Sequence, residues 1–305
     1  MKIAHHPPAK INLFFEVLRR RDDGFHGIVS VASLISLCDT LTVQPKKSSG
    51  IVLTIDGETP DFPAIPSDER NLVVKTLRLL QRECGTNNGA EVMLFKRIPS
   101  QSGLGGGSSD AASALLLANV AWNLNLTETS QLELAAKIGS DVPLFVRSHL
   151  DKSCGTISSG RGEITVSIDG FDELNFVLIK PNEGLETAAV YRDCMKYHDG
   201  KLRNIEPLLE AMRNKDIDKI GDVCFNRLEV PSGKLWNKLE TYKETLIKAG
   251  CLNAIMTGSG TAIYGICKNK EQAKHIAQQL KTNNTFQVWN VTTALSPDVF
   301  KIDEN

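Results

Sequence analysis

Apolar residues in the first part of the chain occur in short runs bounded by polar and turn-forming residues. The runs at residues 11–18, 29–35, 41–43 and 51–55 are typical of β-strands. A helical pattern then extends from about Asn71 to Cys84 and ends at Gly85. The sequence therefore predicts several strands before the first helix.

A glycine-rich segment, GLGGGSSDAA from Gly103 to Ala112, is the most informative part of the sequence. Residues 90–95 before it (AEVMLF) predict a strand that Ile98-Pro99 ends, and residues 108–119 after it predict a helix. Consecutive glycines can turn several backbone N–H groups toward one anion, and a helix N-terminus adds a favourable dipole. This order of strand, glycine loop and helix predicts a phosphate-binding site.

The glycine loop differs from two familiar nucleotide motifs. A Walker A loop requires Lys immediately before its final Ser or Thr, whereas Gly107 precedes Ser108 here. Ser108 also occupies the third glycine position of the Rossmann spacing. A flexible glycine loop that leads into an ordinary buried helix is the alternative interpretation.

The later part of the chain predicts a second α+β unit. A helix at 132–138 is followed by an interruption at 139–143 and by a polar, Ser-rich stretch at 147–163, which predicts a loop or a strained strand. The expected order beyond is a strand from 175, helices between 187 and 248, a strand pair at 254–267, a helix at 271–280 and a strand at 286–292. We place the boundary at residues 169–172, between domains 1–170 and 171–305.

The charge balance limits the classes of partner. The 305 residues include 35 Lys and Arg and 36 Asp and Glu, which gives a net charge of −1. A chain without a basic field is not expected to bind nucleic acid, so phosphate recognition must be local. The hydrophobic content of 41% is enough for globular cores.

The cysteines and the apolar runs indicate a compartment. The seven cysteines are odd in number and include no C-x-x-C pair, which argues against a disulfide framework or a zinc ribbon. No apolar run approaches 18 residues, and no secretory h-region is visible. We expect a cytoplasmic protein with reduced thiols and no membrane association.

Lys10 and Asn12 are candidates for chemistry. They stand two positions apart on a predicted strand, so both side chains point to one face. In a cleft, Lys10 could neutralise a transferring phosphoryl group or hold a catalytic carboxylate, and Asn12 could bind a substrate hydroxyl. An exposed polar strand face explains the same spacing.

Three predicted turns carry further candidates. The turn at 23–26 (DGFH) presents Phe25 and His26 to a flat base, and the turn at 139–143 (GSDVP) places Asp141 at a helix end. The glycines of 256–260 (MTGSG) permit a close approach to a ligand or to the first glycine loop. Ordinary surface turns and a simple hairpin are the alternatives. His5-His6 lacks a third ligand at metal spacing and is assigned no role.

Six segments together resemble the 4-diphosphocytidyl-2-C-methyl-D-erythritol kinases of the GHMP kinase superfamily. The segments are residues 8–13, 23–26, 103–112, 139–143, 160–163 and 256–260. Their ordered set is far more specific than the glycine loop, which matches a superfamily that also phosphorylates mevalonate, homoserine and galactose. The Lys10/Asn12 and Phe25-His26 segments select the cytidine-containing substrate.

The resemblance implies a fold and a reaction. The fold is α+β with two domains, the first ribosomal protein S5 domain 2-like and the second a ferredoxin-like α/β sandwich. The reaction is ATP-dependent phosphorylation of the 2-hydroxyl of 4-diphosphocytidyl-2-C-methyl-D-erythritol, a step of non-mevalonate isoprenoid synthesis. The active cleft is expected between the domains.

The resemblance also implies roles for individual residues. Lys10 and Asp141 resemble the catalytic pair, with Asp141 as a base or as an orienting group. Asn12, Phe25 and His26 resemble the substrate-binding residues. The ATP-binding residues are expected to be Asn71, Lys96, Pro99, Ser100, Gln101, Ser102, Gly103, Leu104, Gly105, Gly106, Gly107, Ser108 and Ser109.

Mg²⁺ is expected with ATP, and the hydroxyl of Ser108 or Ser109 could ligate it, although no metal carboxylate is identifiable. The sequence departs from the family at Phe25, where Tyr is usual, and at the lead-in 99–102, which is less glycine-rich. Residues 147–153 look like an insertion that affects loop geometry near Asp141.

Alternative functions are another GHMP kinase acting on a mevalonate- or homoserine-like alcohol, or a non-catalytic nucleotide-binding regulator. A monomer or homodimer is expected.

Overall fold

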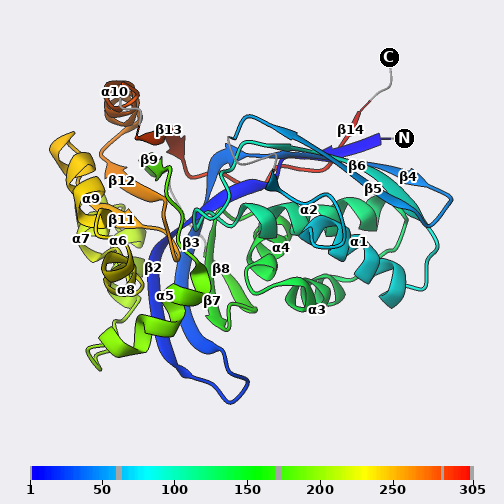
Figure 1. The fold of residues 1–305 in the computed structure, drawn as a ribbon, viewed down its shortest axis with the longest axis horizontal. Coiled ribbons are helices and arrows are strands. Elements are labelled where there is room, and N and C mark those ends of the chain that lie inside the picture. Colours follow the sequence, from blue (N-terminus) through cyan, green and yellow to red (C-terminus); the bar gives the residue numbers. More distant parts are fainter. Residues whose placement is uncertain (1, 60–63, 169–172, 283–284, 303–305) are drawn as a thin grey trace.

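The computed structural model describes residues 2–59, 64–168, 173–282 and 285–302, which form an α+β fold, as predicted (Figure 1). The described strands make three sheets. One sheet has the order β14 (Phe300–Ile302), β1 (Lys2–His5), β4 (Thr40–Lys46), β6 (Gly89–Lys96), β5 (Ile51–Gly57). The second has β10 (Phe225–Asn226), β2 (Pro8–Arg20), β3 (His26–Cys38), β7 (Gly155–Gly160), β8 (Ile164–Ile168). The third has β11 (Ala254–Met256), β12 (Ile263–Cys267), β9 (Asn175–Pro181), β13 (Phe286–Thr292).

The helices of the first half pack beneath the sheet of β4, β5 and β6 (Figure 1). They are α1 (Leu72–Glu83), α2 (Gly106–Ala121), α3 (Glu128–Ile138) and α4 (Val142–Leu150). Helix α2 contacts α1, α4 and β4, and its residues from Ser109 to Ala118 are all buried. Its small and apolar side chains suit this central place, because every face of the helix meets another element.

The second half covers its own sheet on two faces. Helix α10 (Lys270–Leu280) packs on β9 and β13, and α9 (Leu239–Lys248) packs on β11 and β12. The remaining elements are α5 (Thr187–Cys194), the 3₁₀ turn Met195–Tyr197, α6 (Glu206–Arg213), α7 (Ile217–Val223) and α8 (Glu229–Leu235). The opposite face of this sheet shares a hydrophobic core with β2 and β3, which includes Ile11, Phe176 and Tyr264. That shared core joins the two halves.

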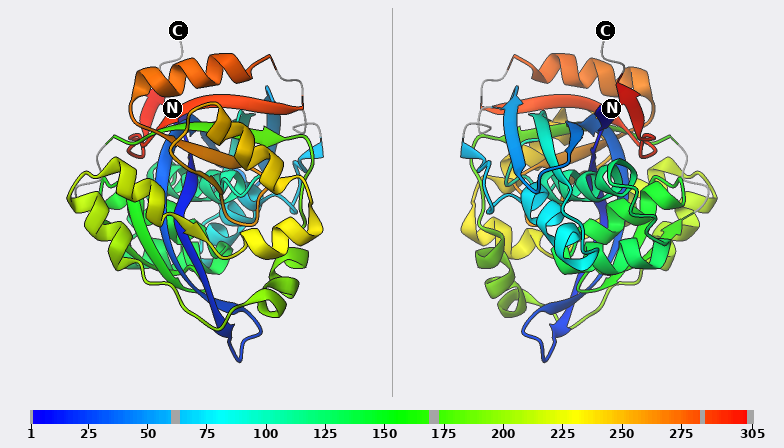
Figure 2. Two further views of the ribbon diagram at one scale, coloured as in Figure 1. Left: turned by 90° about the vertical axis from the view of Figure 1, so that its left-hand side faces the viewer. Right: turned by 90° about the vertical axis from the view of Figure 1, so that its right-hand side faces the viewer.

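Two strands from the second half complete sheets of the first. Phe225 and Asn226 pair in parallel with Phe14 and Phe15 of β2, and β14 pairs antiparallel with β1. The long β2–β3 hairpin projects from the body at the end opposite β1 and β14, which carry the two termini (Figures 1 and 2). The boundary predicted at 169–172 lies outside the described residues.

Most predicted elements occur where the sequence places them, but the expectation for residues 147–163 was wrong. Residues 147–150 are the last turn of α4, and 155–160 are the regular strand β7, which pairs with β3 and β8. Pro143 had suggested a break, yet it stands in the first turn of α4, where proline is favoured. Strand β7 (GTISSG) has weak local propensity and is ordered by pairing on both edges.

Candidate active site

The glycine loop forms the start of α2. Gly105 has φ +71° and immediately precedes the helix. A β-carbon on Gly105 would lie 2.9 Å from Phe145 Cζ and 3.2 Å from Lys10 Cγ, so only glycine fits there. The loop and the first residues of α2, from Gly105 to Ser108, line a cavity of about 310 Å³. Such a helix start attracts anions.

A larger cavity adjoins the glycine loop. It measures about 540 Å³ and is lined on one side by Pro99, Ser100 and Gln101 and on the other by Lys180–Gly184 of the second half. The two cavities share residues 99–101, so they form one continuous groove between the halves. This groove has the size and position for a nucleotide.

The turn between β11 and β12 seals the loop from the second half. A β-carbon on Gly103 would stand 2.0 Å from the carbonyl oxygen of Thr257, and one on Gly258 would stand 3.3 Å from Gly103 Cα. Thr257 Oγ1 also accepts a hydrogen bond of 3.0 Å from the Asn12 backbone N–H. The predicted close approach of the two glycine segments is confirmed, and the turn is a hairpin as well.

Lys10 and Asn12 share one face of β2, as predicted. Lys10 Nζ donates to Asn12 Oδ1 at 2.5 Å, and Asn12 Nδ2 donates to Ser30 Oγ at 2.8 Å. The Lys10 backbone N–H donates to Leu104 O at 2.9 Å, which ties the strand to the glycine loop. Both side chains are buried, so the exposed polar face considered above is excluded.

Asp141 lies opposite Lys10 at the N-terminus of α4. Its carboxylate does not cap its own helix, and no ion pair within 4.0 Å joins it to Lys10 in the part of the chain described. Burial lowers the pKa of Lys10, and the nearby Asp141 charge partly opposes this shift. The Asp141 side chain is half-buried, so it is accessible from solvent.

The tip of the β2–β3 hairpin carries Phe25 and His26. The Phe25 ring is 53% exposed, and the Arg161 guanidinium lies 5.2 Å from its centroid. The centroid of the His26 ring lies 6.0 Å from that of Tyr191 on α5, and buried His26 Nε2 has no hydrogen-bond partner within the described part of the chain. Burial and then the Asp141 charge raise the pKa of Tyr191.

Asn71 and Lys96 lie on the wall of a side cavity next to the loop. Asn71 uses its side chain to cap α1, with Oδ1 accepting from Val73 N at 2.9 Å. Lys96 Nζ pairs with the buried carboxylates of Asp39 and Asp110, the latter at 2.7 Å. Burial lowers the pKa of Lys96, but Asp110 and Asp39 together raise it above its usual range. Both polar groups therefore have structural partners.

Several residues at the site had not been identified from the sequence. Tyr191 lies on an ordinary polar helix, and Lys180-Pro181 ends a buried strand, so neither segment carries a motif. Arg161 belonged to a segment with family resemblance, 160–163, but no role was assigned to it. The turn at 160–163 packs closely against Ser140, because a β-carbon on Gly162 would lie only 2.9 Å from Ser140 O.

The described residues hold no group of three or more His, Cys, Asp or Glu side chains suited to a metal ion. A search of the same residues finds no helix with the length and apolarity to span a membrane.

The chain is similar to known proteins over most of its length. Residues 71–151 match the GHMP kinases N terminal domain, and residues 208–285 match the GHMP kinases C terminal domain. The 4-diphosphocytidyl-2-C-methyl-D-erythritol kinase of Caldanaerobacter subterraneus subsp. tengcongensis is 34% identical over 282 residues, covering 92% of this chain and 93% of the relative. That of Pelotomaculum thermopropionicum is 35% identical over 274 residues, covering 90% and 92%.

A solved structure agrees with these relatives. The crystal structure of a 4-(cytidine 5'-diphospho)-2C-methyl-D-erythritol kinase superposes with a TM-score of 0.79 at 28% identity, covering 97% of this chain and all of the other.

Proposed function

Since this chain belongs to the 4-diphosphocytidyl-2-C-methyl-D-erythritol kinases of the GHMP kinase superfamily, we propose that it transfers the γ-phosphoryl group of ATP to the 2-hydroxyl of 4-diphosphocytidyl-2-C-methyl-D-erythritol. It is an ATP-dependent phosphotransferase with an alcohol acceptor, and the reaction is a step of non-mevalonate isoprenoid synthesis. Its α+β GHMP kinase fold is the one that the sequence motifs implied. We propose a division into domains 1–170 and 171–305.

One observation carries the catalytic assignment: Lys10 packs against Gly105 at the start of α2, and Asp141 at the start of α4 is near enough for its charge to act on the Lys10 ammonium. Asp141 would accept the hydroxyl proton, or orient the hydroxyl, as its oxygen attacks the γ-phosphorus. The Lys10 ammonium and the loop N–H groups would offset the charge that develops on the transferring phosphoryl group. No ion pair within 4.0 Å holds Asp141 in the residues that the structure describes, which supports its role as a proton acceptor.

ATP would bind along the groove between the halves. Residues 99–109 would hold the phosphates through backbone N–H groups, and the larger cavity beside Lys180 and Pro181 would take the nucleoside. Asn71 and Lys96 would contact the nucleotide from the adjoining side cavity, where Asn71 caps α1 and Lys96 is held by Asp39 and Asp110.

Mg²⁺ fits the start of α2. Ser109 Oγ is buried in the first turn and finds no hydrogen-bond partner among the described residues, and Ser108 precedes it in the helix. Hydroxyl oxygen suits this cation, so Ser108 or Ser109 would contribute one ligand, with water completing the shell. When bound, Mg²⁺ screens the β- and γ-phosphate oxygens.

The acceptor would bind where Phe25, His26 and Tyr191 meet. An exposed aromatic ring, a half-buried imidazole with an unpartnered nitrogen and a second ring form a surface for a flat base. Asn12 would bind a hydroxyl of the methylerythritol moiety. Phe25 retains the stacking face that Tyr provides in the family and lacks only the hydroxyl.

We further propose that the enzyme acts in the cytoplasm as a monomer or homodimer, with small molecules and neither nucleic acid nor a membrane as its partners. The Sγ atoms of Cys251 and Cys267 lie 3.9 Å apart as thiols, which suits a reducing compartment.

The test is release of ADP by the purified protein with MgATP and the cytidine substrate, in parallel with mevalonate, homoserine and galactose. Turnover confined to the cytidine substrate is expected. Turnover of another alcohol would show a kinase with a different acceptor. Binding of ATP without any turnover would favour a regulatory protein.

A further inference from the structure

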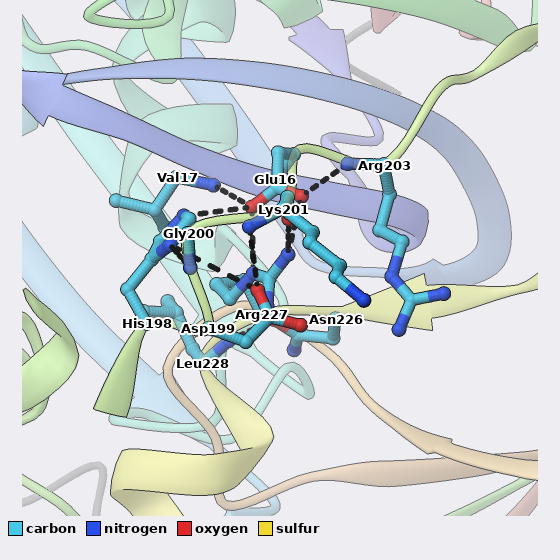
Figure 3. Close-up of polar contacts among 10 residues, drawn as sticks. All are labelled: Glu16, Val17, His198, Asp199, Gly200, Lys201, Arg203, Asn226, Arg227 and Leu228. Carbon is cyan, nitrogen blue, oxygen red and sulfur yellow. Dashed lines mark hydrogen bonds and ion pairs between the residues drawn. The ribbon is translucent and has the colours of Figure 1, made fainter.

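Glu16 on β2 is a buried carboxylate away from the catalytic pair. Its side chain is 1% exposed, and its oxygens accept hydrogen bonds from the backbone N–H groups of Val17 and Arg203, each at 2.9 Å. The Arg227 guanidinium adds two more, from Nε at 2.8 Å and from Nη2 at 2.9 Å (Figure 3). This fork geometry fixes both side chains more tightly than a single ion pair would.

Arg227 extends the contact to a third segment of the chain. Its Nη1 donates to Asp199 Oδ1 at 2.9 Å and its Nη2 donates to Lys201 O at 2.6 Å (Figure 3). Together with the bond from Arg203 N to Glu16, these contacts fasten residues 199–203 to β2. This segment lies between the 3₁₀ turn and α6, has no helix or strand of its own, and is thereby held at three points.

The fastened segment follows the helix that carries Tyr191. Helix α5 ends at Cys194, the 3₁₀ turn ends at Tyr197, and the contacts with the pair begin at Asp199. Cys194 is itself buried, and burial raises the pKa of its thiol to about 11, with smaller opposing effects of the Arg227 and Glu16 charges. The position of α5, and with it the Tyr191 ring beside His26, therefore depends on where this segment is anchored.

The pair also keeps β10 in register with β2. Arg227 N donates to Phe15 O at 2.8 Å, next to the side chain that binds Glu16. The preceding residue, Asn226, donates through Nδ2 to Met256 O at 2.6 Å and to Gly258 O at 2.8 Å. The same strand thus holds the turn that seals the glycine loop.

Stability alone does not account for this arrangement. Removing two charges from water is expensive, and a well-packed apolar pair of similar volume is often as stable as a buried ion pair. An apolar pair, however, has no polar groups with which to bind Asp199, the Lys201 carbonyl and the Arg203 N–H in one fixed geometry.

We propose that Glu16 and Arg227 are positioning residues for the acceptor side of the site: they anchor residues 199–203 and so place Tyr191 against His26. The inference rests on the proposed function, because it assigns the pair to binding of the cytidine-containing acceptor. The residues of the nucleotide groove make no contact with the pair among the described residues. Changes to the Arg227 side chain leave its backbone bond to Phe15 and the Asn226 bonds to the sealing turn in place, so they should have little effect on binding of ATP.

Arg227→Lys is the main test, because lysine keeps the charge beside Glu16 and loses the fork that reaches Asp199 and Lys201. We expect KM for the cytidine acceptor to rise about tenfold while KM for ATP stays within about twofold. Asp199→Ala removes only one anchor, from a side chain that is 44% exposed. This variant should therefore fold normally, and its KM for the acceptor should rise by about threefold. This second variant gives a result even where Arg227→Lys is unstable.

Two controls separate positioning from stability. Arg213→Lys makes the same change in an exposed pair with Glu206 and should leave both KM values unchanged. Ile276→Val trims the core beneath α10 and should lower Tm without affecting either KM. A lower Tm with an unchanged acceptor KM in Arg227→Lys and Asp199→Ala would overturn the proposal, as would an equal rise in both KM values.

Hydrogen exchange gives a readout that does not need the reaction. Amides of residues 187–203 should exchange faster in Arg227→Lys than in Arg213→Lys, and equal rates would contradict the anchoring role. If the wild-type protein releases no ADP with the cytidine substrate, the proposed function fails, but exchange still decides whether the pair anchors this segment.

Discussion

Gly103 and Thr257 meet backbone to backbone, so that the Thr257 carbonyl oxygen lies 2.0 Å from the point where a β-carbon on Gly103 would stand. The two residues are 154 positions apart and belong to different halves of the chain. This contact closes the phosphate loop against the second half. It can form only when residue 103 has no side chain.

Gly103→Ala should therefore destabilise the protein and weaken ATP binding. Gly103 has φ +76°, and a side chain there costs about 1–2 kcal/mol in backbone strain before the clash is counted. Urea unfolding should show a loss of about 2 kcal/mol or more. Gly107→Ala is the matched control for stability, because its nearest neighbour would be Leu72 Cδ1 at 3.9 Å. Equal stability of the two variants would contradict the close approach.

Asp141→Asn should reduce kcat by roughly a hundredfold or more, because the amide cannot accept the hydroxyl proton. Its stability should change little, since the carboxylate makes no capping bond to α4. Steady-state kinetics and thermal unfolding measure the two effects. Asp151→Asn at the other end of α4 serves as the control. Near-normal turnover would remove Asp141 from the mechanism.

Lys10 should impose an alkaline limit on activity. Burial lowers its pKa below the ordinary value of 10.5, so it loses its charge at a lower pH than an exposed lysine does. The charged form stabilises the transferring phosphoryl group, and kcat/KM should therefore fall with rising pH before 10.5. A pH–rate profile measures this limb. Activity that persists through that range would show that the Lys10 charge is not required.

His5 should make the fold sensitive to acid. Burial, and then the nearby His149, lower its pKa from 6.5 to about 4, while Nδ1 contacts Ser113 Oγ at 2.7 Å. Between these values the unfolded chain takes up a proton that the native state does not, so stability falls as pH falls from 6.5 to 4. The loss from this group is about 3 kcal/mol.

Urea unfolding across that range, with His5→Gln beside the wild type, measures the contribution of His5. The variant should be less stable at neutral pH and should show a flatter pH dependence. His275→Gln on the exposed face of α10 should leave the slope unchanged. A slope that His5→Gln does not reduce would assign the acid sensitivity to other groups.

Phe25→Leu should raise KM for the cytidine acceptor by about fivefold and leave kcat nearly unchanged, because stacking on an aromatic ring contributes about 1 kcal/mol. Stability should not change, since the side chain is 53% exposed. Val52→Ala, at a similarly exposed apolar position on β5, is the control. An unaffected acceptor KM would place the base elsewhere.

Local features of the sequence predicted most elements and much of the site. The alternation in β2 placed Lys10 and Asn12 on one face, and the glycines before an alanine-rich helix predicted the anion site. Helix α4 was missed because most of its residues are apolar and Pro143 falls in its first turn, so no single buried stripe marks it. Strand β7 was missed because its Gly and Ser residues acquire their conformation only from β3 and β8.

The sequence by itself determined the strand, loop and helix at the phosphate site, since glycine conformation, capping and helix propensity act between neighbours in the chain. Only the tertiary structure decided that Asp141 lies near Lys10, that the His26 ring lies near the Tyr191 ring and that Glu16 binds Arg227, 211 positions away. Such contacts arise from how sheets and helices pack over a shared core, and no local pattern encodes which distant side chains that packing brings together.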